Sequence, residues 1–377
     1  MQLPVDVKAL IDEATEIDAA QETPLSVSVY VDETAPADLA AHVRNAFASS
    51  SAHVRMTVTY LDSSFAPYED DDLAIIVAGD SLRVGPAAQL VRAVGVPVMV
   101  VTLSPKMVAD KASSGNSAIP EGDVIGPDVP EGAVEPLKLD EVTAAQIDER
   151  MGDWIVAVCR DKRLALSIAF PFMRRSLASD AVKLTSLQNA GIGLVPFIPG
   201  ADLPLMTLNQ AKMVMQIAAA YGHGMNKNRW KELLSVIGTA YLSRMLAREL
   251  TEFIPVLGFV FRTGIAYGST SALGYAVIAY YEGGENATGV ANVMEKAGAF
   301  GKRVADRAGE IAADPSSINF DKAAEVASTA TNVVDEYAPQ VKGFISEFAP
   351  QVKDFVLTNA PKVKDIATSA LAKATAK

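Results

Sequence analysis

The sequence predicts an α/β domain with a parallel sheet, then an all-α hydrophobic helical domain, then an amphipathic helical tail. In the first part of the chain, short apolar runs alternate with helical patterns, as in a parallel sheet covered on both faces. Between 143 and 285, apolar helical segments follow one another and are separated by Pro and Gly turns. From 286 to 377, an apolar stripe repeats every eleven residues. Half of the 377 residues are apolar, which is enough to bury a sizeable core.

The N-terminal segment, residues 1–23, has the pattern of an amphipathic helix. Its apolar residues recur every three or four positions: Leu3, Val7, Leu10, Ile11, Ala14 and Ile17. The segment lacks the basic and then apolar pattern of a secretory signal. We therefore expect the domain that follows to stay in the cytosol.

Residues 24–142 alternate between strand and helix patterns. The predicted strands are Leu25–Asp32, His53–Leu61, Leu73–Ala78 and Val96–Thr102, and the predicted helices between them are Ala37–Ala48 and Gly85–Ala93. Residues 113–136 are rich in Gly, Pro, Ser and Asp, which predicts a long loop. A further helix is expected from about Thr143 to about Arg160, at the start of the helical domain.

Charge differs between the segments. Residues 1–150 carry 25 acidic and 9 basic side chains, whereas residues 151–285 carry 9 acidic and 13 basic ones. The whole chain has a net charge of −12, which argues against broad nucleic-acid binding. Cys159 is the one cysteine, so no intrachain disulfide forms, as is typical of a reducing compartment.

Ile254–Tyr281 is the candidate membrane segment. It is long enough to cross a bilayer and carries a single charge, Arg262. Gly264 and Gly268 form a small-xxx-small pair, which lets helices approach closely. Arg262 would cost about 2.5 kcal/mol or more at mid-bilayer unless it is paired or reaches the interface. Membrane spanning, membrane-surface contact and a soluble helical bundle stay open as alternatives, with membrane contact favoured.

A basic cluster precedes this segment and consists of Arg160, Lys162, Arg163, Arg174 and Arg175. Such a cluster suits the anionic cytoplasmic leaflet, where each charge adds about 1 kcal/mol. The alternative is an ordinary solvated face that joins two domains.

The tail contains a repeat of eleven residues. Ala338–Lys342 recurs as Ala349–Lys353 and again, with one change, as Ala360–Lys364. Eleven residues make about three helical turns, so the apolar residues stay on one face, and each short helix should begin near its Pro. That face could lie on lipid, or it could pack on the protein or on a partner helix.

The residues that catalysis or phosphate binding requires are missing from the expected places. A phosphate loop needs Gly residues and a Lys after the first strand, but Val31–Leu39 has neither and carries acidic residues instead. The histidines have no metal-ligand spacing, and no serine lies in Gly-x-Ser-x-Gly. We expect no catalytic residue, no metal ion and no cofactor.

The helical domain contains motifs that point to a family: Pro196–Pro204 (PFIPGADLP), then Gln210 and Met213, then Glu252–Gly258 (EFIPVLG) and Thr270–Gly274 (TSALG). On these motifs, Leu164–Gly284 resembles the DUF697 family, which includes the YcjF-like bacterial membrane proteins. The resemblance implies a membrane-associated helical domain behind an Era-like GTPase domain.

Residues 24–142 resemble such a GTPase domain whose motifs are lost. Asp72–Asp80 and Gly95–Val101 are similar to two of its strands. The guanine-reading Asn-Lys-x-Asp is replaced by Thr102–Pro105, and Asp62–Phe65, at the place of Asp-x-x-Gly, lacks the Gly. The resemblance therefore implies a degenerate P-loop GTPase-like domain without its nucleotide.

The Pro-Gly-Ala-Asp turn and the helix after it hold the candidate structural or interaction residues, together with Arg262, Gly264 and Gly268. Pro199 and Gly200 form the turn, and Asp202 is expected to cap the next helix, although a binding role is an alternative. Asn209 and Gln210 lie near an apolar helix face and are expected to connect neighbouring helices by hydrogen bonds.

These observations favour a non-catalytic scaffold or adaptor at the cytoplasmic face of the bacterial membrane. Its degenerate domain would bind a protein partner such as a GTPase, and a homo-oligomer is a further option. Two alternatives remain: a soluble nucleotide-responsive switch in the cytoplasm with an atypical phosphate site, and a small channel or transporter built from oligomerised helices.

Overall fold

The structure is a computed structural model, and it describes residues 7–49, 51–194, 202–223, 270–271 and 273–283. The chain forms two compact units. The α/β unit comprises Ala14–Asp180 and Ala218–Met225. The helical unit comprises Met1–Glu13, Ala181–Ile217 and Asn226–Lys377.

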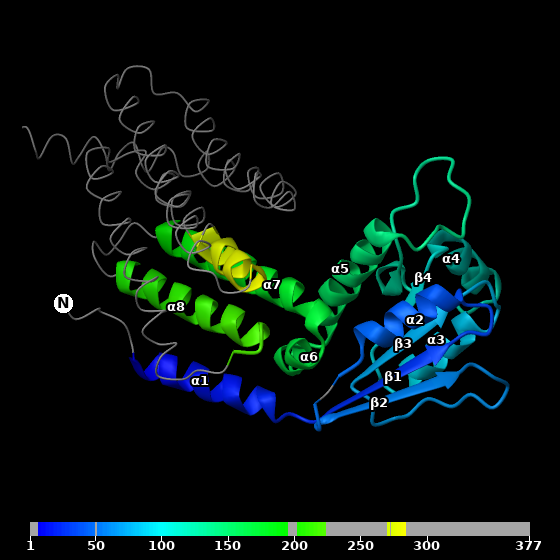
Figure 1. Cartoon of the computed structure of the whole chain (residues 1–377), viewed down its shortest axis with the longest axis horizontal. Helices are drawn as coiled ribbons and strands as arrows, with labels where there is room; N and C mark the ends of the chain where they lie inside the picture. Colours follow the sequence, from blue (N-terminus) through cyan, green and yellow to red (C-terminus); the bar gives the residue numbers. More distant parts are fainter. Residues whose placement is uncertain (1–6, 50, 195–201, 224–269, 272, 284–377) are drawn as a thin grey trace, which may run out of the picture. The chain divides into compact units, whose positions relative to one another are not determined.

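The α/β unit is built on a five-stranded, fully parallel sheet in the order β2-β1-β3-β4-β5 (Figure 1). The strands are β1 (Leu25–Val31), β2 (Val54–Tyr60), β3 (Leu73–Ala78), β4 (Val98–Thr102) and β5 (Val124–Ile125). The predicted α/β domain with a parallel sheet is thus confirmed. Every residue of β3 and β4 is buried, because helices cover both faces of the sheet centre.

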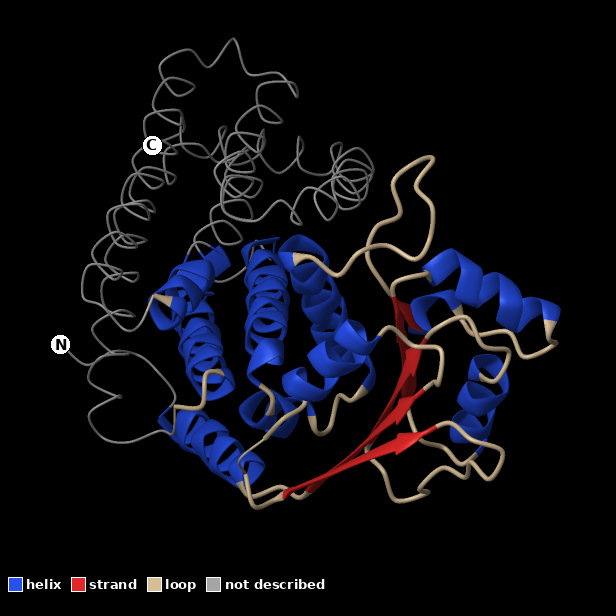
Figure 2. Cartoon of the chain, turned by 45° about the vertical axis from the view of Figure 1, so that its right-hand side comes forward, coloured by secondary structure: helices blue, strands red, loops and turns tan. Residues whose placement is uncertain are grey.

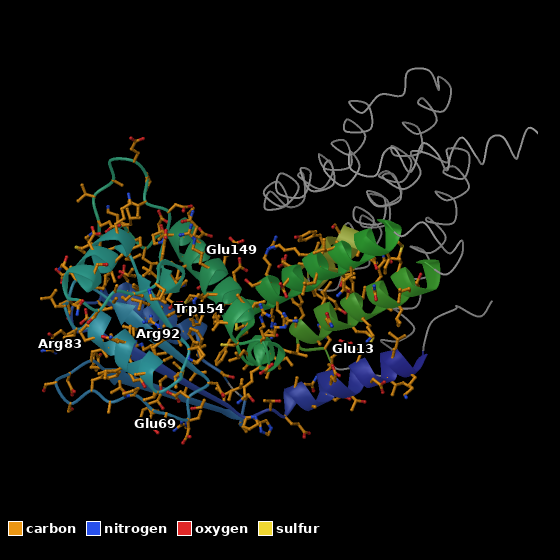
Figure 3. The ribbon with its side chains drawn as sticks, turned by 180° about the vertical axis from the view of Figure 1, so that it is seen from behind. Glu13, Glu69, Arg83, Arg92, Glu149 and Trp154 are labelled. Carbon is orange, nitrogen blue, oxygen red and sulfur yellow. The ribbon has the colours of Figure 1, made fainter. Side chains whose placement is uncertain are left out.

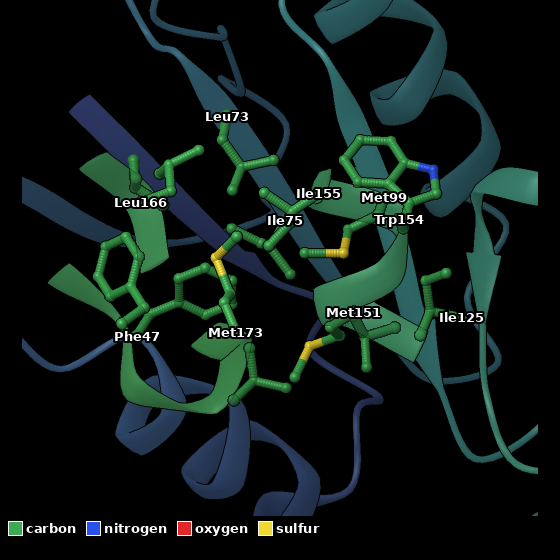
Figure 4. Close-up of a cluster of buried hydrophobic side chains, with 14 of the residues drawn as sticks. Phe47, Leu73, Ile75, Met99, Ile125, Met151, Trp154, Ile155, Leu166 and Met173 are labelled. Carbon is green, nitrogen blue, oxygen red and sulfur yellow. The ribbon is translucent and has the colours of Figure 1, made fainter. Parts of the chain in front are cut away.

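Helices lie on both faces of the sheet (Figure 2), and a hydrophobic core lies between the sheet and the helices on each face. On one face, α2 (Ala37–Ala46), α5 (Glu141–Val158) and α6 (Arg163–Ala169) pack against the strands. Figure 4 shows part of this core, including Phe47, Met151 and Trp154. On the other face lie α3 (Val84–Ala93) and α4 (Pro105–Ser114).

The predicted loop 113–136 contains regular structure. It includes the end of α4, a short 3₁₀ helix at Glu121–Asp123 and β5. Two residues of strand are too few to produce an alternation that can be recognised in the sequence. The helix α4 begins with Pro105, a residue that suits a first helical turn because its missing N–H has no acceptor there.

The predicted boundary at 142/143 does not coincide with the division between the units. The helices α5 and α6 belong to the α/β unit, which continues to Asp180 within α7 (Arg174–Leu194). The reason is burial: Ile147, Met151 and Ile155 on α5 are fully enclosed in the core under the sheet. Their apolar stripe looks in the sequence like the start of the helical domain.

The helical unit contains α7 from Ala181 onward, α8 (Asp202–Ala220) as far as Ile217, and helical residues at 270–271 and 273–282. The first residues of α1 (Val7–Gln21) also belong to it. Glu13, labelled in Figure 3, is 11% exposed and bonds to α8 through Lys212 Nζ at 3.3 Å and Gln216 Nε2 at 2.7 Å. The predicted N-terminal helix is therefore held by partly buried polar contacts as well as by its apolar stripe.

Within the described ranges, no helix combines the length and the hydropathy that a membrane crossing requires. Most of Ile254–Tyr281 lies outside those ranges, including Arg262, Gly264 and Gly268. The whole tail 286–377, with its eleven-residue repeats, also lies outside them.

Candidate functional site

The three sequence segments that would carry nucleotide motifs lie at the same end of the sheet, beyond the carboxyl ends of its strands. They follow the carboxyl ends of β1, β2 and β4, and in a parallel sheet these ends lie on the same side. In doubly wound sheets of this strand order, ligands bind at this edge, where the chain switches direction between β1 and β3. The carboxyl ends of β1 and β3 are therefore the place to look for a ligand.

The turn after β1 closes that switch point. Asp32 is 1% exposed, and its Oδ2 accepts hydrogen bonds from Thr34 Oγ1 at 2.5 Å and from the Gly79 amide at 3.2 Å. Thr34 Oγ1 in turn accepts from the amides of Asp80 at 2.8 Å and Ser81 at 3.1 Å. Three consecutive backbone N–H groups after β3, which could have cradled a phosphate, donate to side chains of this chain instead.

The contact between the two turns leaves no gap. A Cβ added to Gly79 would lie 2.1 Å from the carbonyl oxygen of Thr34 and 2.2 Å from its carbonyl carbon. Glycine is required at residue 79 because the backbone of the β1 turn passes directly over it. The pattern of an apolar strand followed by a Gly was visible in the sequence, but the residue that covers this Gly was not.

The charges at this edge are paired with one another. The Nη1 atom of Arg83, a residue labelled in Figure 3, lies 3.5 Å from Glu33 Oε1 and also donates to the carbonyl of Leu61 at 3.3 Å. Lys111 Nζ lies 3.4 Å from Asp80 Oδ2. Arg83 and Lys111 therefore each face a carboxylate. These pairs are partly exposed, so each contributes little to stability.

A second carboxylate occupies the N-terminus of α4. The two oxygens of Glu135 accept from the amides of Lys106 at 3.1 Å and Met107 at 2.8 Å. A helix N-terminus is a common anion site, because its first amides point outward and its dipole favours negative charge. Here the anion is a side chain from 28 residues farther along the chain. Sequence reasoning missed it because Glu135 lies in the predicted loop.

One oxygen at the switch point has no hydrogen-bond partner within the described part of the chain. This atom is Asp32 Oδ1, which is buried. No group of three or more His, Cys, Asp or Glu side chains that could hold a metal ion occurs among the residues that the structure describes. A single carboxylate oxygen is too few ligands for a divalent cation, which takes six or more oxygens.

The groove at the opposite, amino edge is lined by charges that are already paired. It has a volume of about 510 Å³, and Ser26, Arg55, Asp72 and Lys162 are among its lining residues. Lys162 Nζ lies 2.6 Å from Asp72 Oδ1, and Arg55 Nη2 lies 3.2 Å from Asp71 Oδ1. Lys162 and Arg55, the Lys and Arg side chains of the lining, are thus each paired with a carboxylate.

The predicted basic cluster is divided by these contacts. Lys162 is used in the ion pair just described, and Arg163 Nη1 lies 2.8 Å from Asp180 Oδ2. Arg160 and Arg175 are exposed, whereas Arg174 is half-buried and its Nε has no hydrogen-bond partner among the described residues. Lys162 and Arg163 are thus each paired with a carboxylate in partly exposed ion pairs.

Within the helical unit, Asn209 and Gln210 donate hydrogen bonds to neighbouring helical segments. Asn209 Nδ2 donates to Asn189 Oδ1 at 3.0 Å, and Gln210 Nε2 donates to Thr270 Oγ1 at 2.8 Å. Asn189 Nδ2 also donates to Thr270 Oγ1 at 3.0 Å. These bonds join α7, α8 and the helical residues near 270, three segments that are far apart in the sequence.

Of the turn residues, Pro199 and Gly200 lie outside the described part. The helix α8 begins at Asp202, where the sequence predicts a cap, but the side chain of Asp202 also lies outside that part. The capping role therefore stays a prediction.

A scan against protein-family models, a search of curated proteins and a search of solved structures found no match to this chain. The resemblance to the DUF697 family and to GTPase domains stays a prediction from the motifs.

Proposed function

We propose that this chain is a non-catalytic, membrane-associated scaffold or adaptor. Its α/β unit would bind a protein partner, and its helical part, with the tail, would attach it to the cytoplasmic face of the membrane. One observation supports a role for the α/β unit in protein binding rather than in nucleotide chemistry. The backbone amides at the ligand edge of the sheet donate to Asp32, Thr34 and Glu135 of the chain itself.

A nucleotide would have to break these contacts before it could bind. It would displace two carboxylates from amides that they already satisfy, and its phosphates would meet Glu33 and Asp80 nearby. Losing a hydrogen bond to a charged group costs about 1.5–3 kcal/mol. The proposal includes a GTPase-like ancestry for this unit, but it does not depend on that ancestry, because flavodoxin-like sheets of this strand order bind ligands at the same edge.

Thermal unfolding with added nucleotide tests whether the α/β unit binds nucleotide. A ligand at a hundred times its Kd stabilises a protein by about 2.7 kcal/mol. For a unit of this size, that raises the melting temperature by roughly 5–11 °C. We expect no shift with GTP, ATP or pyrophosphate at millimolar concentration, with or without Mg²⁺. A saturable rise with any of them would show that the α/β unit binds nucleotide, which would refute this part of the proposal and favour a nucleotide-responsive switch.

Vesicle binding tests the second half. The exposed charges of the basic cluster, Arg160 and Arg175, should supply the attraction to anionic lipid, at about 1 kcal/mol each. Replacing both by Gln should weaken partitioning onto anionic vesicles about 30-fold, with no change on neutral vesicles. Lys162 and Arg163 are unsuitable for this test because their ion pairs belong to the fold. Full release of the parent chain from membranes by an alkaline wash would leave only peripheral attachment, and release at low salt would contradict membrane association.

A further inference from the structure

The strand β2 forms a long sheet edge without the usual protection. All seven of its residues pair in register with β1, and no strand among the described residues pairs with its other side. Natural sheets protect edges with Pro, Lys, bulges or very short strands. Here β2 has no Pro, Lys, Gly or bulge, whereas β5 at the other edge has two residues. Val58 is 43% exposed and Tyr60 is 65% exposed.

The backbone groups that face outward can be identified from the hydrogen bonds at the two ends of β2. The Leu25 amide donates to the His53 carbonyl, and the Leu61 amide donates to the Val31 carbonyl, both at 2.9 Å. Because successive residues of a strand point their backbone groups to opposite sides, the odd-numbered residues face β1. Met56, Val58 and Tyr60 therefore direct their N–H and C=O groups away from the sheet.

We propose that β2 pairs with β2 of a second copy of this chain, antiparallel, about a two-fold axis at Thr57. In this register, Thr57 faces Thr57 of the second copy, and Met56 faces Val58 of the second copy. Residues 56 and 58 both have outward backbone groups, so each such pair exchanges two hydrogen bonds. Of the two-fold registers, this one alone pairs all seven residues, and Val54 then faces Tyr60 of the second copy.

The side chains and the charges fit this partner. The pairs are aromatic with β-branched, apolar with apolar and Thr with Thr, all of which stabilise sheets. The one charge in the strand, Arg55, would face an uncharged Thr59. Residues 1–150 have a net charge of −16, from 25 acidic and 9 basic side chains, yet no Asp or Glu occurs between Asp38 and Asp62. Two acidic units therefore meet least repulsion along this stretch.

Pairing would also cover exposed apolar surface. Val54 and Met56 pack against the core formed with α2 and α5, and Val58 and Tyr60 lie on the same face of the strand. Across the axis, Val58 would contact Met56 of the second copy, so the core would continue from one unit into the next. The result is one sheet with five strands from each copy.

Disulfide trapping of the full chain tests this register. At the axis, the two Thr57 residues form a pair without hydrogen bonds, with Cα atoms about 4.5 Å apart, within disulfide range. Thr57→Cys should therefore yield a covalent dimer on mild oxidation, seen on a non-reducing gel. Thr59→Cys is the matched control, because the two copies of residue 59 would lie about 14 Å apart. The native Cys159 is buried, so the parent chain should stay monomeric on the gel.

A second variant separates specific pairing from random collision. Val58→Pro removes an N–H that faces outward, so β2 should still pair with β1, but it blocks addition of another strand. Added to Thr57→Cys, it should abolish the covalent dimer while the far-ultraviolet circular dichroism stays unchanged. No dimer from Thr57→Cys, equal dimer from Thr59→Cys, or a dimer that persists with Val58→Pro overturns the proposal. None of these outcomes depends on nucleotide or membrane binding.

Discussion

Gly79→Ala should strongly destabilise the α/β unit, because the turn after β1 lies directly against Gly79. The new Cβ would lie 2.1 Å from a backbone oxygen of Thr34, whereas ordinary contacts begin near 3.4 Å. Rotation of a side chain cannot relieve this overlap, since the Thr34 backbone itself must move. Overpacking of this kind costs about 1–3 kcal/mol. Displacing Thr34 also weakens its hydrogen bonds with the amides of Asp80 and Ser81, at about 1 kcal/mol each.

The expected loss is therefore about 3–5 kcal/mol, or roughly 6–20 °C in melting temperature for a unit of this size. The chain has two tryptophans. A Trp230→Phe background leaves Trp154, which lies in the core under the sheet, as the fluorescence reporter for this unit. Gly122→Ala is the matched control, because nothing lies within 4 Å of its added Cβ and its φ is not positive. If Gly79→Ala and Gly122→Ala melted at the same temperature, the closed switch point would be refuted.

Three further predictions concern other contacts. The amide and hydroxyl of Thr143 bond to the Asp140 carboxylate at the start of α5 and lower its pKa. The ionised carboxylate therefore stabilises the fold above about pH 4, and this contribution disappears as pH falls through the lowered pKa. Asp140→Ala should therefore lower the melting temperature at pH 7, and the difference from the parent should shrink at pH 2–3. Burial raises the pKa of Cys159 to about 11, so its thiol should react slowly with a disulfide reagent at pH 8 and rapidly once the chain is unfolded in guanidinium. Thr270→Val should keep the side-chain volume but remove the hydroxyl that accepts from Asn189 and Gln210, which should cost about 1–3 kcal/mol for each amide N–H left unpaired. Thr270→Ser keeps the acceptor and should cost less. Equal losses of stability for the two variants in urea unfolding would argue against this hydrogen-bond network.

The sheet could be predicted from the sequence because its central strands are buried on both sides. Leu73–Ala78 matches the predicted strand at both ends, and β4 begins two residues after the predicted start. What the sequence could not show was β5, with two residues, and the assignment of α5 to the sheet. An apolar helical stripe indicates that a helix is buried, but not which surface buries it.

At the candidate site, only the lack of a phosphate loop could be predicted from the sequence. The sequence showed that Val31–Leu39 lacks a phosphate loop, because such a loop is a local pattern. It did not show what replaces the ligand, since Thr34 reaches Asp80 across 46 residues and Glu135 reaches Lys106 across 29. Asn209 and Gln210 were easier to interpret, because amide side chains beside an apolar helix face must find partners there.

The closed edge limits where a partner of the α/β unit can bind. Helices cover both faces of its sheet, and the amides at the carboxyl edge are satisfied internally. At the amino edge, Lys162 and Arg55 are paired with carboxylates. Among the described residues, the outer side of β2 is therefore the place where a row of backbone donors and acceptors remains for recognition. If a second copy occupies it, the protein partner that we propose would have to bind elsewhere on the unit, and residues 1–150 carry 25 acidic and 9 basic side chains. Such binding should weaken as salt rises, because attraction between exposed charges is screened over about 10 Å at 0.1 M ionic strength.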